Sequence, residues 1–201
     1  MNVIIGIDPS LTGTGVAAAE GLHTITSKPR DTTLTGRRAR LTEIRHELDN
    51  IVLGVKPWQF EHTPNLVVIE APSLAQKSQA GTLDRNGLWW LIVDRLHTLG
   101  IPVVEVTPST LKKFATGKGN ATKPDMRMAL YQRAGLDCRD DNQVDAWWLR
   151  QVGLHILEDP NRIPLPLTHT TALAKVARGD VLTAGANSSP NKTAAKPEGN
   201  R

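Results

Sequence analysis

Two acidic residues end apolar segments that have the length and composition of buried strands. The segment "VIIGI" runs directly into Asp8, and "LVVI" runs directly into Glu70. Burying an unpaired carboxylate costs several kcal/mol, so we expect a cationic partner at each strand end. The structural alternatives are that Asp8 is a turn residue after its strand and that Glu70 lies past the edge of the sheet.

A third acid, Asp145, lies on the apolar stripe of a predicted helix. It is in register, at steps of four, three and four residues, with Leu149, Val152 and Ile156. This spacing places Asp145 on the face that packs against a sheet. Asp141 and Asn142 lie on that face one turn earlier, and Asp140 or Asp141 is also a suitable N-cap for the helix.

The chemistry that fits these residues is catalysis by a hard divalent metal. Three or four carboxylates without Cys or His select Mg²⁺ or Mn²⁺. Two such ions about 4 Å apart activate a water and stabilise the leaving oxygen in phosphodiester hydrolysis. The single cysteine, Cys138, excludes a disulfide framework and a Cys-rich zinc site, and the six histidines lack metal-ligand spacing.

Basic residues are distributed unevenly along a chain whose net charge is only +4. Residues 107–139 contain two acids and seven basic residues, which are Lys112, Lys113, Lys118, Lys123, Arg127, Arg133 and Arg139. A second cluster opens the first long helix and contains Arg37, Arg38, Arg40 and Arg45. Either cluster alone is typical of a solvated face, but a basic flank beside an acid cluster predicts a nuclease.

The hydrophobic period predicts the elements that position these side chains. Three strands joined by short Gly-containing turns form an antiparallel meander over residues 3–7, 16–19 and 22–27. A helix over residues 36–53 and two βα units follow, built on "NLVVIEAP", "GLWWLIVDRLHTLG" and "IPVVEVTP". Further helices are expected over residues 109–114, 124–134 and 142–157.

The chain is expected to form one nuclease domain with a tail. We assign residues 1–158 to the domain, 159–178 to a Pro-rich strap with at most a short terminal helix, and 179–201 to a disordered tail. No apolar run approaches the roughly 18 residues of a membrane span, and no signal peptide precedes the first strand. We therefore expect a soluble, cytoplasmic protein without a membrane partner.

Four segments together resemble the RuvC-type Holliday junction resolvases, especially phage-borne members, of the ribonuclease H-like superfamily. In order along the chain they are "IIGIDPSLTGTGVA", "LVVIEAP", "VTPSTLKKFATGKGNATK" and "DDNQVDAWWL". The likeness extends from about Asn2 to Leu157. It implies an α/β fold whose mixed five-stranded sheet, a three-stranded antiparallel meander plus two parallel strands, is flanked by helices.

The resemblance also implies roles for individual residues. Asp8, Glu70 and Asp145 match the family's catalytic, metal-binding acids. The fourth ligand, an Asp or His in many resolvases, falls at Asn142 with Asp141 beside it; we favour Asp141 and retain both.

The predicted DNA-binding residues come from the family pattern and from the two basic clusters. Lys112 and Lys123 match residues that contact the junction and support catalysis. Lys113, Lys118, Arg37 and Arg38 extend the basic surface. The loop after Glu70 lacks the aromatic residue with which bacterial members probe the junction centre, and Leu74 is the apolar candidate for that place.

The predicted function is that of a crossover junction endodeoxyribonuclease. It would cut four-way DNA junctions with paired symmetric nicks that leave a 5′-phosphate and a 3′-hydroxyl, using two Mg²⁺ or Mn²⁺ ions and no small-molecule cofactor. A two-fold junction matches a homodimer. The helix over residues 88–93 is a candidate interface, since at most one ring of Trp89 and Trp90 can face the core, an arrangement that Trp147 and Trp148 are expected to repeat. If the protein is phage-encoded, its location is the host cytoplasm.

Alternative functions use the same acids or the same first strand. A nuclease of this fold could act on flaps, forks or RNA, and a catalytically silent protein could bind junctions. A sugar kinase or chaperone-like ATPase shares the first strand motif but needs a much longer chain. The segment "ATGKGN" is not a P-loop, because no Ser or Thr follows its Lys118.

Overall fold

A computed structural model describes residues 2–28, 31–55, 63–72, 81–174 and 176 of this protein. Its centre is a five-stranded sheet in the order β3-β2-β1-β4-β5. The strands are β1 (Ile4–Asp8), β2 (Gly13–Ala18), β3 (Gly21–Thr26), β4 (Leu66–Glu70) and β5 (Val103–Val106). β1, β2 and β3 form an antiparallel meander, and β4 and β5 run parallel to β1. The predicted mixed α/β sheet is confirmed.

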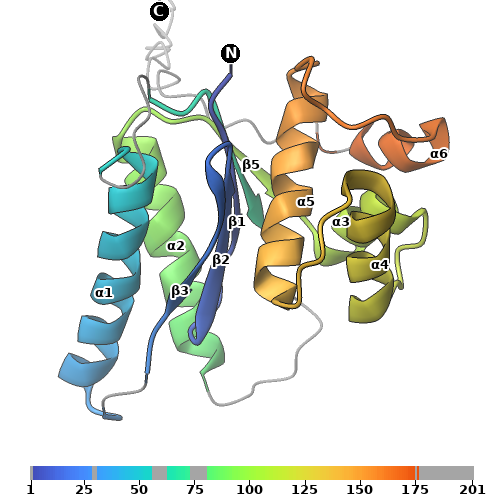
Figure 1. Ribbon diagram of the computed structural model, residues 1–201. Helices are drawn as coiled ribbons and strands as arrows, with labels where there is room; N and C mark the ends of the chain where they lie inside the picture. Colours follow the sequence, from blue (N-terminus) through green and yellow to red (C-terminus); the bar gives the residue numbers. More distant parts are fainter. Residues whose placement is uncertain (1, 29–30, 56–62, 73–80, 175, 177–201) are drawn as a thin grey trace, which may run out of the picture.

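Helices cover both faces of this sheet (Figure 1). α1 (Leu34–Val52) and α2 (Thr82–Thr98) lie on one face, and α5 (Asp141–Ile156) lies across the other. Because side chains alternate along a strand, Ile5 and Ile7 join the core under α1 and α2, while Ile4 joins the core under α5. Each face of the sheet therefore has its own packed core.

A second helical layer packs outside α5. It consists of α3 (Pro108–Thr116) and α4 (Lys123–Ala134), followed by α6 (Leu167–Thr170) and a 3₁₀ turn, η1 (Thr171–Ala174). α6 and η1 lie within the predicted strap and contact α3, and Leu173 belongs to the core under α5. The predicted tail, residues 179–201, lies outside the described residues.

This second layer corrects one expectation about the tryptophans. Trp89 is buried and Trp90 is 64% exposed, as adjacent residues on a one-sided helix should be. Trp147 and Trp148 do not repeat that arrangement, because both are buried, with ring centroids 4.9 Å apart in a T-shaped contact. α5 is covered on two sides, by the sheet and by α4, so two of its faces are apolar.

α5 lies unusually close to the sheet because glycines face it. A Cβ atom on Gly6 would come within 2.1 Å of the Ala146 carbonyl oxygen, and one on Gly15 within 2.0 Å of the Asn142 carbonyl oxygen. Gly6 lies on the same strand as Asp8, and Gly15 is the residue opposite Asp8 on β2. The small residues around Asp8 therefore make room for the first turns of α5.

Candidate active site

The sheet topology brings two acidic strand ends together. β1 and β4 are adjacent and parallel, with Ile7 opposite Ile69, so Asp8 and Glu70 are the next residues at the same edge. The indole Nε1–H of Trp89, on α2, donates a 2.9 Å hydrogen bond to the Glu70 carbonyl oxygen. That contact fixes the end of β4 against the helix behind it.

α5 contributes the third acid to the same place. Asp145 lies one turn inside the helix, and its carboxylate shares a cavity of about 320 Å³ with Asp8 and Glu70. The cavity is also lined by Pro9, Ser10, Ala71, Pro72, Arg85, Trp89, Pro108, Lys123 and Asn142. Three of the four predicted catalytic acids therefore meet, from three separate elements.

Burial, with added repulsion from neighbouring acids, changes the acidity of these three groups. Desolvation, followed by the charges of Glu70 and Asp145, raises the pKa of Asp8 well above its usual range. Desolvation and the Asp145 charge raise the pKa of Glu70 to about 7. Desolvation raises the pKa of Asp145 to about 6, although Lys123 and Lys112 act in the opposite direction. The cluster thus favours any cation that can replace its protons.

The donor set of the cavity suits a hard cation, since it offers carboxylate and amide oxygens and no Cys or His. Among residues 2–28, 31–55, 63–72, 81–174 and 176, no group of three His, Cys, Asp or Glu side chains is spaced to hold a metal ion, although the Asp8 and Glu70 side chains are within hydrogen-bonding reach of each other. The raised pKa values describe buried carboxylates whose charged forms a bound cation would stabilise.

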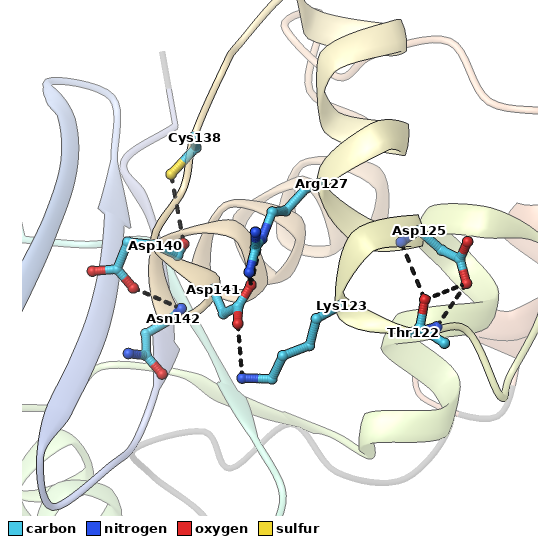
Figure 2. A network of polar contacts seen from close by, with 8 residues as sticks. All are labelled: Thr122, Lys123, Asp125, Arg127, Cys138, Asp140, Asp141 and Asn142. Atoms are coloured by element: carbon cyan, nitrogen blue, oxygen red, sulfur yellow. Dashed lines mark hydrogen bonds and ion pairs between the residues drawn. The ribbon is translucent and has the colours of Figure 1, made fainter.

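Asp141 and Asn142 are placed differently. Asn142 lines the cavity with the three acids, whereas Asp141 is paired with two basic side chains of α4. Arg127 foremost, with Lys123, holds the pKa of Asp141 below its usual range, although burial opposes them. Figure 2 shows the Asp141 carboxylate between Lys123 and Arg127 and the Asn142 amide on another side of the helix.

The predicted DNA-binding residues divide into near and remote groups. Lys123 lines the cavity, and the charge of Lys112 acts on both Glu70 and Asp145. Lys113 lines a separate 260 Å³ cavity with Ser109 and Thr171, and Lys118 is exposed in the turn after α3.

The two predicted arginines lie on the opposite side of the sheet, at the start of α1. Arg37 donates a 2.9 Å hydrogen bond to Asp84 of α2, so it links these two helices. Arg38 is exposed beside it and lines the same groove between α1 and α2. Leu74, the predicted apolar wedge, lies outside the described residues.

Curated relatives decide the family. The crossover junction endodeoxyribonuclease RuvC of Nocardia farcinica is 30% identical over 135 residues, which are 66% of this chain and 69% of that protein. The chain belongs to the RuvC family. The enzyme of the same name from Streptomyces griseus is 30% identical over 140 residues, 67% of this chain and 65% of that protein. No protein-family model matches the chain.

Solved RuvC structures share the fold. Thermus thermophilus RuvC superposes with a TM-score of 0.57 at 16% identity, covering 89% of this chain and 99% of that one. RuvC of the same organism in complex with a Holliday junction substrate gives a TM-score of 0.56 at 19% identity, covering 75% and 91%. The RuvC fold explains why the ends of β1 and β4 and the start of α5 converge.

Two residues at this RuvC-family site escaped the sequence analysis. Arg85 and Trp89 line the cavity from α2, whose sequence predicted a helix and a candidate dimer interface at Trp89 and Trp90 but no part in the site. The available signal was their position at the start of the helix that follows Glu70, since a helix returning from a strand end passes that end again. Their spacing of four residues puts both on one face.

Proposed function

We propose that this RuvC-family protein is a metal-dependent endodeoxyribonuclease that resolves four-way DNA junctions. The observation that carries the proposal is the meeting of Asp8, Glu70 and Asp145 in one oxygen-lined cavity beside Lys123. Relatives named crossover junction endodeoxyribonuclease, and a neighbour solved with a Holliday junction substrate, support the substrate.

Asp8, Glu70 and Asp145 are the residues that would hold two Mg²⁺ or Mn²⁺ ions. Such ions supply an activated water and a countercharge for the leaving oxygen when they are bound. Glu70 is oriented for this role because Trp89 fixes its main chain. Lys123, at the cavity wall, and Lys112, close enough to act on two of the acids, would balance the charge of the scissile phosphate.

A homodimer is part of the proposal, because paired cuts require two active sites related by a two-fold axis. α2 exposes Trp90 and, two turns earlier, Leu83, which is 74% exposed. Leu34 and Leu91 line a groove between α1 and α2 on the same side. These apolar side chains lie among Arg37, Arg38 and Arg45 of α1, on the face of the sheet opposite α5 (Figure 1). A partner there leaves the wall of the cavity that α5 and α4 form open to DNA.

The cytoplasmic location of the protein stays a prediction. Among the described residues, none of the helices has the length and apolar character to cross a membrane. A substrate of branched DNA supports the cytoplasm as the place of action.

The deciding experiment is cleavage of a labelled immobile four-way junction with Mg²⁺ or Mn²⁺, alongside a linear duplex and a flap. We expect paired symmetric nicks at the junction, and none with Asp8→Asn or Asp145→Asn, which should still bind it. Asp137→Asn, which changes an exposed carboxylate outside the cavity and outside α2, is the matched control and should cut normally.

Other outcomes point to other functions. Equal cutting of the flap or duplex would leave the metal site standing and make the protein a broader nuclease. Junction binding with no cutting of any substrate would favour a silent junction-binding protein.

A further inference from the structure

Asp141 has both of its carboxylate oxygens occupied by basic side chains of α4. Arg127 Nε and Nη2 each lie 2.6 Å from Oδ1, and Lys123 Nζ lies 3.0 Å from Oδ2. The Asp141 side chain is only 21% exposed, whereas those of Lys123 and Arg127 are 64% and 41% exposed. Asp141 is thus the least exposed member of this network, and the two basic side chains are its more exposed partners.

The geometry of α4 prepares both cations for this contact. Lys123 and Arg127 are four residues apart, so they project from one face of the helix. A capping box between Thr122 and Asp125 fixes the first turn, with the Thr122 N–H donating to Asp125 over 2.8 Å. The Asp125 carboxylate is held in that cap, and the ion-pair partner of Lys123 is Asp141 (Figure 2).

Three consecutive residues at the start of α5 contact three different parts of the molecule. Asp140 caps the helix through the Asn142 N–H and accepts a 2.6 Å hydrogen bond from Thr24 of β3. Asp141 faces α4, and Asn142 faces the cavity with Asp8 and Asp145. A divalent cation on the Asp141 oxygens would lie against an ammonium and a guanidinium, whose like charges repel it.

We infer that Asp141 is a positioning residue that holds Lys123 against the active-site cavity, and that Asn142 takes the place beside the three acids. This inference rests on the proposed function in one respect, which is that the phosphate contacted by Lys123 belongs to junction DNA. Without Asp141, Lys123 is free to turn away from the substrate or onto the carboxylates of Asp8 and Asp145, whose charges already act on it. Asp141 therefore prevents the cavity from being closed by the protein's own lysine.

The first test measures metal binding by the free protein, so it does not depend on cleavage. Mn²⁺ binding is followed by calorimetry in a Lys123→Met background, where no released lysine can compete. Adding Asp141→Asn is expected to change the dissociation constant by less than about twofold. Adding Asn142→Ala is expected to weaken it clearly. A loss of Mn²⁺ affinity with Asp141→Asn that matches the loss with Asp145→Asn would overturn the inference.

The second test measures the coupling between Asp141 and Lys123. Single-turnover cleavage with saturating metal should fall about tenfold or more in Asp141→Asn and in Lys123→Met. The double variant should lose no more than about twofold beyond Lys123→Met alone, because the acid acts through the lysine. Additive losses would contradict the assignment. Asp137→Asn, which removes an exposed carboxylate just before α5, is the matched control and should behave as wild type.

The two proposals fail in different ways. Cleavage confined to flaps or duplex, with the coupling intact, would overturn the junction substrate and leave the role of Asp141 standing. Normal junction resolution with impaired Mn²⁺ binding in Asp141→Asn would do the reverse. Circular dichroism of each variant identifies a loss of fold.

Discussion

The three acidic residues of the cavity lie where their charged forms are unfavourable. Asp8, Glu70 and Asp145 line one cavity, and desolvation with repulsion from neighbouring acids raises the pKa of each. The folded protein binds protons there that the unfolded chain releases. This local cost in stability is consistent with the proposed role of the three acids in binding a cation.

The pKa of Glu70 predicts how stability depends on pH in the absence of metal. Its folded pKa of about 7 lies above its ordinary value of 4.5, so its proton stabilises the folded state below pH 4.5, and this contribution is lost as the pH rises through 7. Glu70→Gln should therefore stabilise the metal-free protein at pH 8, by on the order of 1 to 3 kcal/mol, and much less at pH 4.5. Urea unfolding in a chelator measures this.

The control for that measurement is Glu47→Gln, which changes an exposed glutamate on α1. It should shift the unfolding free energy little at either pH. Equal stability of wild type and Glu70→Gln at pH 8 would contradict the raised pKa.

Lysines near the cavity make a second prediction at this scale. Lys112→Ala should weaken junction binding and lower the salt slope by about one, since one phosphate contact is lost. Binding is measured in Ca²⁺ over a range of salt concentrations. Arg162→Ala lies beyond the far end of α5 and should leave the slope unchanged; a common loss in both variants would contradict the assignment.

Sequence reasoning identified single residues where they broke a pattern. The carboxylates of Asp8, Glu70 and Asp145 interrupt apolar periods, so their cost on burial made them visible. Arg85 and Trp89 break no period on α2 and were missed. Whether Asp141 or Asn142 lies beside the three acids depends on where α4 packs relative to α5. The hydrophobic period of either helix does not predict that packing.

Among the elements, α5 determines the site because it carries Asp145 and touches β1, β2 and β4. Its close docking depends on Gly6 and Gly15. The hydrophobic period, together with the positions of Gly and Pro residues, predicted the order of strands and helices. The burial of both Trp147 and Trp148 did not, because a period reports one packed face and α5 has two.

Gly15→Ala should therefore damage both docking and chemistry. Its Cβ would meet backbone atoms of Asn142, which cannot rotate away, so we expect a loss of about 2 kcal/mol or more in unfolding free energy and weaker Mn²⁺ binding. Gly87→Ala on α2 is the matched control, since its Cβ would lie 3.7 Å from a Leu41 methyl group. It should be neutral or stabilising. Equal effects of the two substitutions would refute the docking argument.

At the scale of the whole molecule, the sheet separates the layer of α3, α4 and α5 from the layer of α1 and α2, where the dimer interface is proposed (Figure 1). The basic residues at or near the cavity are Lys112 of α3, Lys123 of α4 and Arg85 of α2. On the other side, α1 with α2 exposes Leu34, Leu83, Trp90 and Leu91 beside Arg38. The sequence pointed to α2 because two adjacent tryptophans cannot both face one core. The share of α1 in that surface depends on how the two helices pair, which only the fold shows.

Trp90→Glu should separate the proposed dimer without unfolding the chain, because the ring is exposed in a single subunit. Sedimentation should give wild type at twice the 21.9 kDa chain mass and the variant at the chain mass. Tyr131→Glu, which alters an exposed ring on α4, should leave the mass unchanged. A wild type that sediments as a single chain would remove the dimer from the proposal.

The hydrogen bond from Trp89 to the Glu70 carbonyl oxygen also has a practical value. An indole at the wall of the cavity is a built-in fluorophore whose emission responds to nearby charge. The difference between wild type and Trp89→Phe would isolate its signal from those of the other four tryptophans. Stopped-flow fluorescence could then time the arrival of ions and DNA separately, with no label attached to either.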